Sequence, residues 1–258
     1  MNPIIQIEDV SVELSGNSIL SNISLDIAQG EYVSIIGPNG AGKTTLMRCL
    51  LGMYPYQGSV RVAGTECSTA NAKELARQVS YVPQTHDMEF PLPVFDFVMM
   101  GRYPYLSPLS PAQKKDIQAV ENALEVTGTD LFRDRLLRTL SGGERQKVYI
   151  AAALAQETPV MLLDEPATFL DWKHQAEVMQ LLKKINQERG ATIVAVNHDL
   201  NSAAHWSDRI IAIKDGTVFA HGAPNELIQP EPLNKLFETT FVQKTTLAPA
   251  TGEFDQNN

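Results

Sequence analysis

The sequence has little of what marks secreted or nucleic-acid-binding proteins. Only two cysteines, Cys49 and Cys67, occur among its 258 residues, and they form neither a metal-ligand spacing nor a disulfide framework. We therefore expect a reducing, cytoplasmic environment. Lys and Arg number 21 against 30 Asp and Glu, so the net charge is −9. This sign argues against nucleic acid as a main partner, because phosphate backbones attract basic proteins.

Long apolar runs are also missing. The most apolar stretches, such as YIAAALA at 149–155, are far shorter than the roughly 18 residues that a bilayer-spanning helix needs. The N-terminal segment MNPIIQIEDV has neither a basic region nor a cleavable apolar core, so we expect no export signal. The chain is nevertheless long enough to bury a sizeable core, which predicts a globular protein.

Strand-like runs alternate with turn residues over the first part of the chain. Three β-rich runs lie between residues 4 and 36, separated by Ser15-Gly16-Asn17 and by Gln29-Gly30. Such a pattern is typical of strands that pair through tight turns. We expect further strands at 58–63 and 79–82.

A helical segment follows. Between about 88 and 157 several prolines precede a helical periodicity that includes Ile117, Val120 and Leu124. We expect an inserted helical subdomain here, with Ser110-Pro111 at the start of its clearest helix.

The pattern of the next part of the chain predicts a buried parallel sheet. Two apolar runs, at 159–165 and 191–199, are separated by a helix with Val178, Leu182 and Ile185 on one stripe. Strand, helix and strand without polar alternation indicate parallel strands buried on both faces. The segment 209–222 reads as a hairpin with Asp215-Gly216 at its turn.

A phosphate-binding loop is predicted at GPNGAGKT, residues 37–44, between a strand and a helix. The pattern G-x-x-x-x-G-K-[ST] uses glycines so that consecutive backbone N–H groups can face phosphate oxygens. The lysine then reaches the β- and γ-phosphates and the Thr hydroxyl ligates Mg²⁺. We therefore predict ATP and Mg²⁺ as ligands, and the nucleotide-binding residues are Gly37, Pro38, Asn39, Gly40, Ala41, Gly42, Lys43, Thr44 and Thr45.

Two carboxylates follow the apolar strand at 160–163. Asp164 and Glu165 stand at its carboxyl end, which is where ligands gather in open α/β sheets. Asp164 can hold Mg²⁺ through water, while Glu165 can polarise the water that attacks the γ-phosphate. In isolation these residues would more often cap a turn and supply surface charge. Downstream of a phosphate loop we favour the catalytic interpretation.

Two further polar residues follow strands in the same way. His198 ends the run TIVAVN and Gln84 follows VSYVP. Taken alone, a strand-end histidine is more often structural, and a loop glutamine is more often only solvated.

The segment LSGGERQ at 140–146, taken with the preceding motifs, resembles the ATP-binding cassette (ABC) transporter family along nearly the whole chain. The resemblance implies that two cassettes face each other head to tail, with ATP between the phosphate loop of one and Ser141, Gly142 and Gly143 of the other. A helix N-terminus there suits the γ-phosphate. The resemblance also implies that Gln84 contacts Mg²⁺ and the attacking water, and that His198 contacts the γ-phosphate.

Two positions depart from the family pattern. Asp171 matches an aspartate that communicates across the dimer, but Phe169 stands where a small residue is common. Leu14 occupies the place of an aromatic residue that stacks on adenine. We therefore expect weaker stacking and measurable use of GTP.

The fold class that follows is α/β, a P-loop NTPase core with a mostly parallel sheet, an N-terminal antiparallel β subdomain and an inserted helical subdomain. We expect a single ATPase domain over 1–258. Its core comprises 1–87 and 158–230, its helical subdomain about 88–157, and its C-terminal extension 231–258, of which the last residues, TGEFDQNN, are expected to be flexible.

One cassette without a membrane segment resembles the ATP-hydrolysing subunits of bacterial importers, which serve separate membrane permeases and, indirectly, a substrate-binding protein. The segments MGRYPY at 100–105 and HDLN at 198–201 resemble cassettes of importers of metal chelates, such as ferric siderophores, haem or cobalamin. Such a subunit is peripheral, at the cytoplasmic face of the inner membrane. An exporter cassette, a soluble non-transport ABC ATPase and a P-loop kinase are the alternatives.

A docking surface for the permease is expected at the apolar loop 90–94 together with 100–105. The alternative is that these residues pack beneath the helical subdomain.

Overall fold

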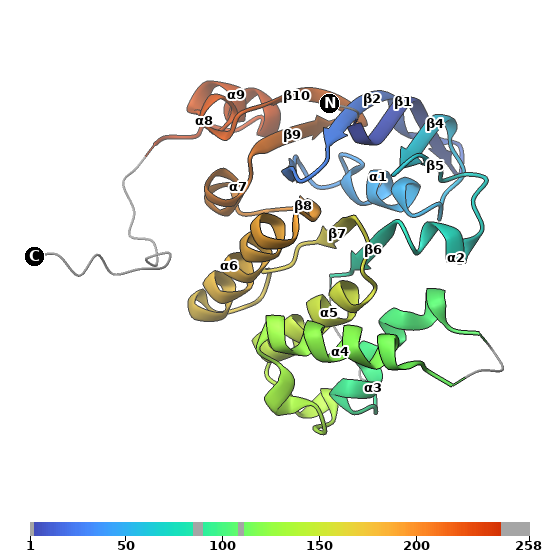
Figure 1. Ribbon diagram of the computed structural model, residues 1–258. Helices are drawn as coiled ribbons and strands as arrows, with labels where there is room; N and C mark the ends of the chain where they lie inside the picture. The colour runs from blue at the N-terminus through green and yellow to red at the C-terminus, as the bar shows by residue number, and fades with distance from the viewer. Residues whose placement is uncertain (1–2, 85–89, 108–110, 244–258) are drawn as a thin grey trace, which may run out of the picture.

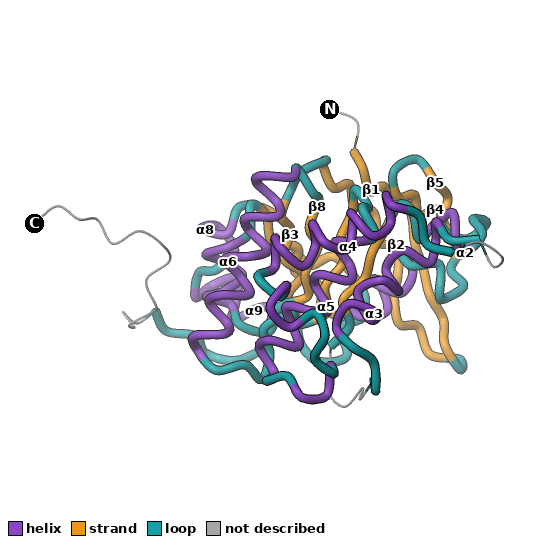
Figure 2. The backbone as a smooth tube through the Cα atoms, turned by 60° about the horizontal axis from the view of Figure 1, so that its bottom comes forward, coloured by secondary structure: helices purple, strands orange, loops and turns teal. Residues whose placement is uncertain are grey.

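The computed structural model describes residues 3–84, 90–107 and 111–243. Two β-sheets and a group of helices make up the described chain (Figure 1). In the rotated view of Figure 2 helices α3, α4 and α5 come forward, and strands lie behind them. This arrangement confirms the α/β class and the antiparallel, parallel and helical parts that the sequence predicts.

The N-terminal sheet is antiparallel, with strand order β2-β1-β4-β5. The turn between its first two strands contains Ser15 and Gly16, both with positive φ, as a tight hairpin with right-handed strand twist requires. The strands are β1 (Pro3–Leu14), β2 (Asn17–Ala28), β4 (Gln57–Val62) and β5 (Thr65–Glu66).

The second sheet has the order β10-β9-β3-β8-β7-β6, and every neighbouring pair is parallel except β9 with β10. Asp215 and Gly216 form the turn of that hairpin with positive φ, as predicted. The strands are β3 (Tyr32–Ile36), β6 (Val79–Val82), β7 (Val160–Asp164), β8 (Thr192–Val196), β9 (Arg209–Lys214) and β10 (Thr217–Gly222).

One strand pairing was predicted wrongly. The third run of the N-terminal part was expected to pair with the second through the turn at Gln29-Gly30. Instead β3 pairs in parallel with β8 and β9. Its five residues are buried on both faces, and only a central position in the parallel sheet can cover both faces of so apolar a strand.

Alternating side chains of the parallel sheet feed two different cores. From β8, Val194 and Val196 join the cluster under the antiparallel sheet, whereas Ile193 and Ala195 join the cluster beneath the helices. The sheet therefore supports the antiparallel layer on one face and the helical layer on the other.

Helices occupy the remaining segments. The clearest helix of the inserted region begins at Lys114, with Gln113 as its N-cap and Asp116 closing a capping box. The predicted start at Ser110-Pro111 is therefore wrong for Pro111, which precedes the helix, while Ser110 lies outside the described residues. The helices are α1 (Lys43–Leu50), α2 (Ala72–Leu75), α3 (Val94–Met99), η1 (Met100–Tyr105), α4 (Lys114–Thr127), η2 (Asp130–Phe132), η3 (Leu137–Thr139), α5 (Gly142–Ala155), α6 (Trp172–Arg189), α7 (Leu200–Trp206), α8 (Pro224–Leu227) and α9 (Pro230–Phe237).

The expected domain limits can be placed on these elements. The range 88–157 encloses the helices from α3 to α5, and residue 231 falls inside α9, whose Leu233 and Leu236 are buried in a third core cluster. The expected flexible end, TGEFDQNN, lies outside the described residues. Within the described ranges, no helix combines the length and the apolar character that a membrane crossing requires.

Candidate functional site

The predicted phosphate loop connects β3 to α1, at the carboxyl end of a central strand. Gly37 has φ 151°, and a Cβ there would lie 2.0 Å from the carbonyl oxygen of Ile213. At Gly42, with φ 99°, a Cβ would lie 2.5 Å from Cδ2 of Leu20. Both positions therefore require glycine because of the neighbouring strands, quite apart from any ligand. Of these three loop glycines, only Gly40 has no atom within 4 Å of a built Cβ.

Lys43 is held by its own loop. Its Nζ donates hydrogen bonds of 2.8 Å to the carbonyl oxygens of Gly37 and Pro38. Burial lowers the pKa of Lys43, and the charges of Glu165 and Asp164 oppose that shift. The ammonium is therefore buried near two acidic residues. A bound phosphate would compete with the two carbonyl oxygens for its hydrogen bonds.

Thr44 and Asp164, the residues expected to bind Mg²⁺, lie next to each other. The Thr44 hydroxyl and the Tyr81 hydroxyl each donate to Oδ2 of Asp164 over 3.4 Å. Burial, followed by the charge of Glu165, raises the pKa of Asp164, while these two hydrogen bonds lower it. A buried carboxylate beside a hydroxyl offers the oxygen ligands that Mg²⁺ prefers, so the residues present fit this ion. Tyr81 is a contact that the sequence analysis missed.

Gln84, Glu165 and His198 come together although they follow different strands. Oε1 of Glu165 lies 2.6 Å from Nε2 of His198, and its Oε2 accepts a 2.7 Å hydrogen bond from Nε2 of Gln84. Glu165 also has a positive φ of 52°, which is uncommon for a residue other than glycine and frequent at functional sites. The predicted catalytic residues therefore form one contact cluster.

A cavity of about 340 Å³ lies between the phosphate loop and this cluster. Asn39, Gly40, Gly42, Lys43, Thr44, Thr45, Glu165 and His198 all contribute to its wall. Ile19 of β2 does so too, and no sequence motif pointed to it. Ile19 brings an apolar side chain from the antiparallel sheet to the nucleotide-binding loop. Leu14, in contrast, is half-buried and packs against the core under that sheet.

The residues of the SGG segment do not line this cavity. Ser141 is the N-cap of α5 and forms a capping box with Glu144. Ser141 and Gly142 are exposed, whereas Gly143 is buried. Asp171 caps α6, and the preceding Phe169 is 78% exposed. Within one chain, this helix start and the phosphate loop therefore belong to separate surfaces.

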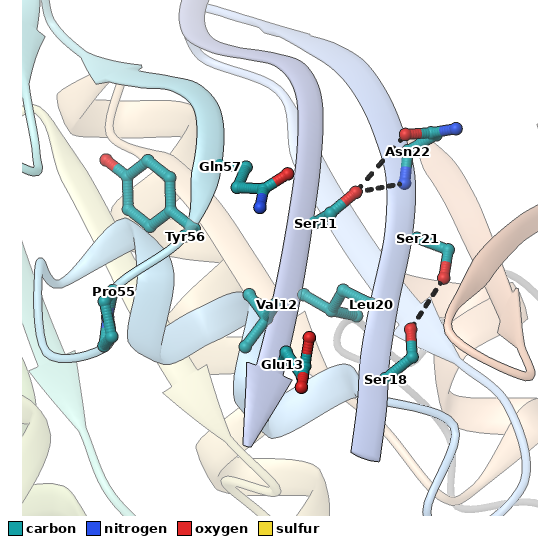
Figure 3. Close-up of a pocket in the computed structure, with 10 residues that line it drawn as sticks. All are labelled: Ser11, Val12, Glu13, Ser18, Leu20, Ser21, Asn22, Pro55, Tyr56 and Gln57. Carbon is teal, nitrogen blue, oxygen red and sulfur yellow. Dashed lines mark hydrogen bonds between the residues drawn. The ribbon is translucent and has the colours of Figure 1, made fainter. Parts of the chain in front are cut away.

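A second cavity, of about 490 Å³, lies on the antiparallel sheet and shares no lining residue with the first. Figure 3 shows that its polar side chains bond to one another, Ser11 to Asn22 and Ser18 to Ser21. No residue predicted to be functional contributes to this cavity.

Comparisons with known proteins agree with the site geometry. Residues 20–168 match the family model described as ABC transporter. The chain is 42% identical to the petrobactin import ATP-binding protein FpuC of Bacillus anthracis, over 84% of this chain and 80% of the relative. It is 38% identical to the ferric enterobactin transport ATP-binding protein FepC of Escherichia coli K12, over 89% of this chain and 85% of the relative.

Solved structures agree as well. The dimeric structure of a bacterial ABC transporter cassette superposes with a TM-score of 0.73 at 30% identity, covering 85% of this chain and 98% of the cassette. The phosphate loop, the strand-end carboxylates and these similarities lead to one conclusion: the chain belongs to the ABC transporter family, as an ATP-binding and ATP-hydrolysing subunit.

Proposed function

We propose that this ATPase drives a metal-chelate importer, with a ferric siderophore as the preferred cargo and haem or cobalamin as the next candidates. The observation that carries the proposal is the 38–42% identity to FpuC and FepC, which are named for petrobactin import and ferric enterobactin transport. These similarities extend over at least 84% of the chain, so they include the helical region as well as the nucleotide site.

The cavity beside the phosphate loop is the ATP site in this proposal. Lys43 and the loop N–H groups bind the phosphates, and Thr44 and Asp164, with Gln84, hold Mg²⁺. When bound, Mg²⁺ neutralises charge on the β- and γ-phosphates. Glu165 orients and polarises the attacking water, and His198 contacts the γ-phosphate. The cluster of Gln84, Glu165 and His198 supports these roles, because both Glu165 oxygens are already bound by residues that would surround the γ-phosphate.

The active form in this proposal is a head-to-tail dimer of two copies. Ser141, Gly142 and Gly143 of one copy complete the site of the other, so that ATP is held between them. The exposed N-terminus of α5 supports this arrangement, since Ser141 and Gly142 are accessible and lie outside the chain's own nucleotide cavity. A second copy can therefore reach them.

The remaining partners are two membrane permease subunits and, indirectly, a substrate-binding protein. The subunit is then peripheral, at the cytoplasmic face of the plasma membrane. In this proposal the helices between α3 and α5 act as the subdomain that transmits the permease contact, within a single ATPase domain. Their packing on Val120, Leu124 and Val148 would let them move as a unit.

Fewer residues can contact the permease than the sequence analysis expected. Val94, Arg102 and Pro104 are buried, so the expectation that these side chains face the permease is wrong. Met100 and Tyr103 are 52% and 67% exposed. Two apolar side chains with this much exposure on one short helix suit the docking of an apolar partner segment. We therefore assign the docking surface to Met100 and Tyr103.

The rigid support of this surface strengthens the assignment. Arg102, between Met100 and Tyr103, binds Asp116 of α4 and the carbonyl of Ala155 at the end of α5. A force on the docking segment would therefore reach the helix that begins at Ser141.

The test is co-purification of the chain with its native permease, followed by uptake measurements with ferric siderophores, haem, cobalamin and oxyanions. Uptake of a metal chelate that requires ATP and the intact chain supports the proposal. Export of the same compounds, or ATPase activity with no permease in the complex, would favour an exporter cassette or a soluble ATPase instead. Cysteines at Met100 and Tyr103 that form no cross-link to the permease would contradict the docking surface.

A further inference from the structure

His174 lies between two segments that the proposed dimer places on the same partner site. It is the third residue of α6 (Trp172–Arg189), three positions after the Asp171 cap. Its ring faces the start of α5, because a Cβ built on Gly143 would lie 2.4 Å from Cδ2 of His174 and 2.7 Å from its Cβ. The ring therefore covers Gly143 with no room for even one additional carbon atom.

The other side of the ring is bound to Asp171. Nδ1 of His174 lies 2.9 Å from both carboxylate oxygens of Asp171, and the His174 backbone N–H donates to Oδ1 over 2.9 Å. These hydrogen bonds lower the pKa of Asp171, so the carboxylate is ionised at neutral pH and keeps its acceptor role. One carboxylate thus fixes the ring and the helix cap together.

The N-terminus of α5, on the side of the His174 ring away from Asp171, also has defined contacts. Ser141 and Glu144 form a reciprocal capping box. A Cβ built on Gly142 would lie 3.6 Å from Cδ2 of Leu170, an ordinary contact distance, so Leu170 lies close to this glycine. The loop that carries Asp171 and the helix that begins at Ser141 therefore meet along Leu170 and His174.

We infer that His174 is a positioning residue, which holds Asp171 and the Ser141–Gly143 helix start in a fixed relative arrangement so that both meet the nucleotide site of a second copy together. The inference rests on the proposed head-to-tail dimer. It also explains why residue 143 is glycine: the requirement comes from the His174 ring, whereas an approaching phosphate would account for Gly142, which is exposed.

This role makes a prediction that distinguishes it from a merely structural one. The chain's own cavity contains neither His174 nor Asp171. Replacing His174 should therefore leave nucleotide binding by the isolated copy intact while weakening the ATP-dependent dimer. A residue that only stabilised the fold would weaken both.

The experiment uses the full chain in the Glu165→Gln background, in which ATP is expected to hold the dimer. Binding of a fluorescent ATP analogue is measured at low protein concentration, and dimer formation is measured by sedimentation with ATP. For His174→Ala we expect analogue binding within twofold of the parent and a dimer about tenfold weaker, the order expected for loss of one coupled contact. His174→Asn, which can still donate to Asp171, should recover part of the loss. His221→Ala, an exposed histidine on β10, is the control and should change neither quantity.

A second pair of variants tests the steric part. Gly143→Ala should abolish the dimer, although alanine favours a helix more than glycine does. The double variant Gly143→Ala/His174→Gly should restore dimer formation to the level of His174→Gly, because both the ring and the His174 Cβ, which would lie 2.7 Å from the added carbon, are gone. A normal dimer in His174→Ala, or a double variant no better than Gly143→Ala, would overturn the inference alone. Absence of any ATP-dependent dimer in the parent would overturn the head-to-tail arrangement, and the inference with it.

Discussion

His198 and Glu165 are in direct contact, with Nε2 of the imidazole 2.6 Å from Oε1 of the carboxylate. Because Gln84 binds the other oxygen, Glu165 has no carboxylate oxygen without a protein partner. In the proposed mechanism the attacking water must therefore bind Glu165 at a remaining lone pair or in place of one of these contacts. The proposed closure of a second copy over the nucleotide would supply the change in the site that this needs.

Glu165→Gln keeps the size of the side chain and removes the charge. We expect phosphate release to fall at least about 100-fold, the lower range for loss of a general base. ATP binding should persist, and the ATP-bound chain should elute as a dimer in size-exclusion chromatography. Glu188→Gln, on the exposed end of α6, is the matched control. Normal turnover of Glu165→Gln would remove this residue from the catalytic role.

Leu14 lacks the aromatic ring expected to stack on adenine and packs against the core without lining the nucleotide cavity, so we expect GTP hydrolysis to be measurable beside ATP hydrolysis at equal concentrations. Leu14→Tyr should tighten ATP binding by about tenfold, since base–aromatic stacking contributes about 1–3 kcal/mol. Leu14→Met keeps an apolar, non-aromatic side chain and should behave like the parent. The hydrolysis rates of ATP and GTP test this prediction, and strict dependence of the parent on ATP would contradict it.

Arg102 and Asp116 form a buried ion pair with side chains only 3% and 2% exposed. Arg102→Ala leaves the Asp116 charge buried without its partner, which should lower the free energy of unfolding by about 3–5 kcal/mol. The matched variant Arg133→Ala breaks a pair with Glu121 whose side chains are 42% and 36% exposed, and should cost about 0–1 kcal/mol. Urea unfolding of both variants measures the contrast. Equal losses would mean that burial does not set the strength of these pairs.

Glu177 of α6 binds Lys147 of α5, and this hydrogen bond lowers the pKa of Glu177, while burial opposes the shift. A lowered pKa in the folded state means that ionised Glu177 stabilises the fold above its ordinary pKa, about 4.3. That contribution is lost as the pH falls through the folded-state value. Glu177→Gln should therefore be less stable than the parent at pH 7, and the difference should shrink only as the pH falls below about 4. Thermal unfolding over this range tests the prediction, and a difference that does not change with pH would contradict it.

Much of the architecture could be predicted from local patterns. The glycines and lysine of residues 37–44, the apolar runs of β7 and β8 and the hairpin at Asp215-Gly216 each depend on residues close in sequence. The start of α4 could not be placed correctly, because Ser110-Pro111 and Gln113 with Asp116 are both acceptable helix starts. Only the side-chain bonds of Gln113 and Asp116 decided between them.

The sequence by itself determined the candidate residues for nucleotide chemistry, because that chemistry requires particular side chains at fixed local spacings. Only the tertiary structure decided how those residues meet. The order of the parallel strands brings Gln84 and His198 onto Glu165, and the packing of α5 on α6 places His174 over Gly143. Contacts between residues far apart in the chain depend on which strands and helices become neighbours, and that is set by burial of apolar surface over the whole molecule.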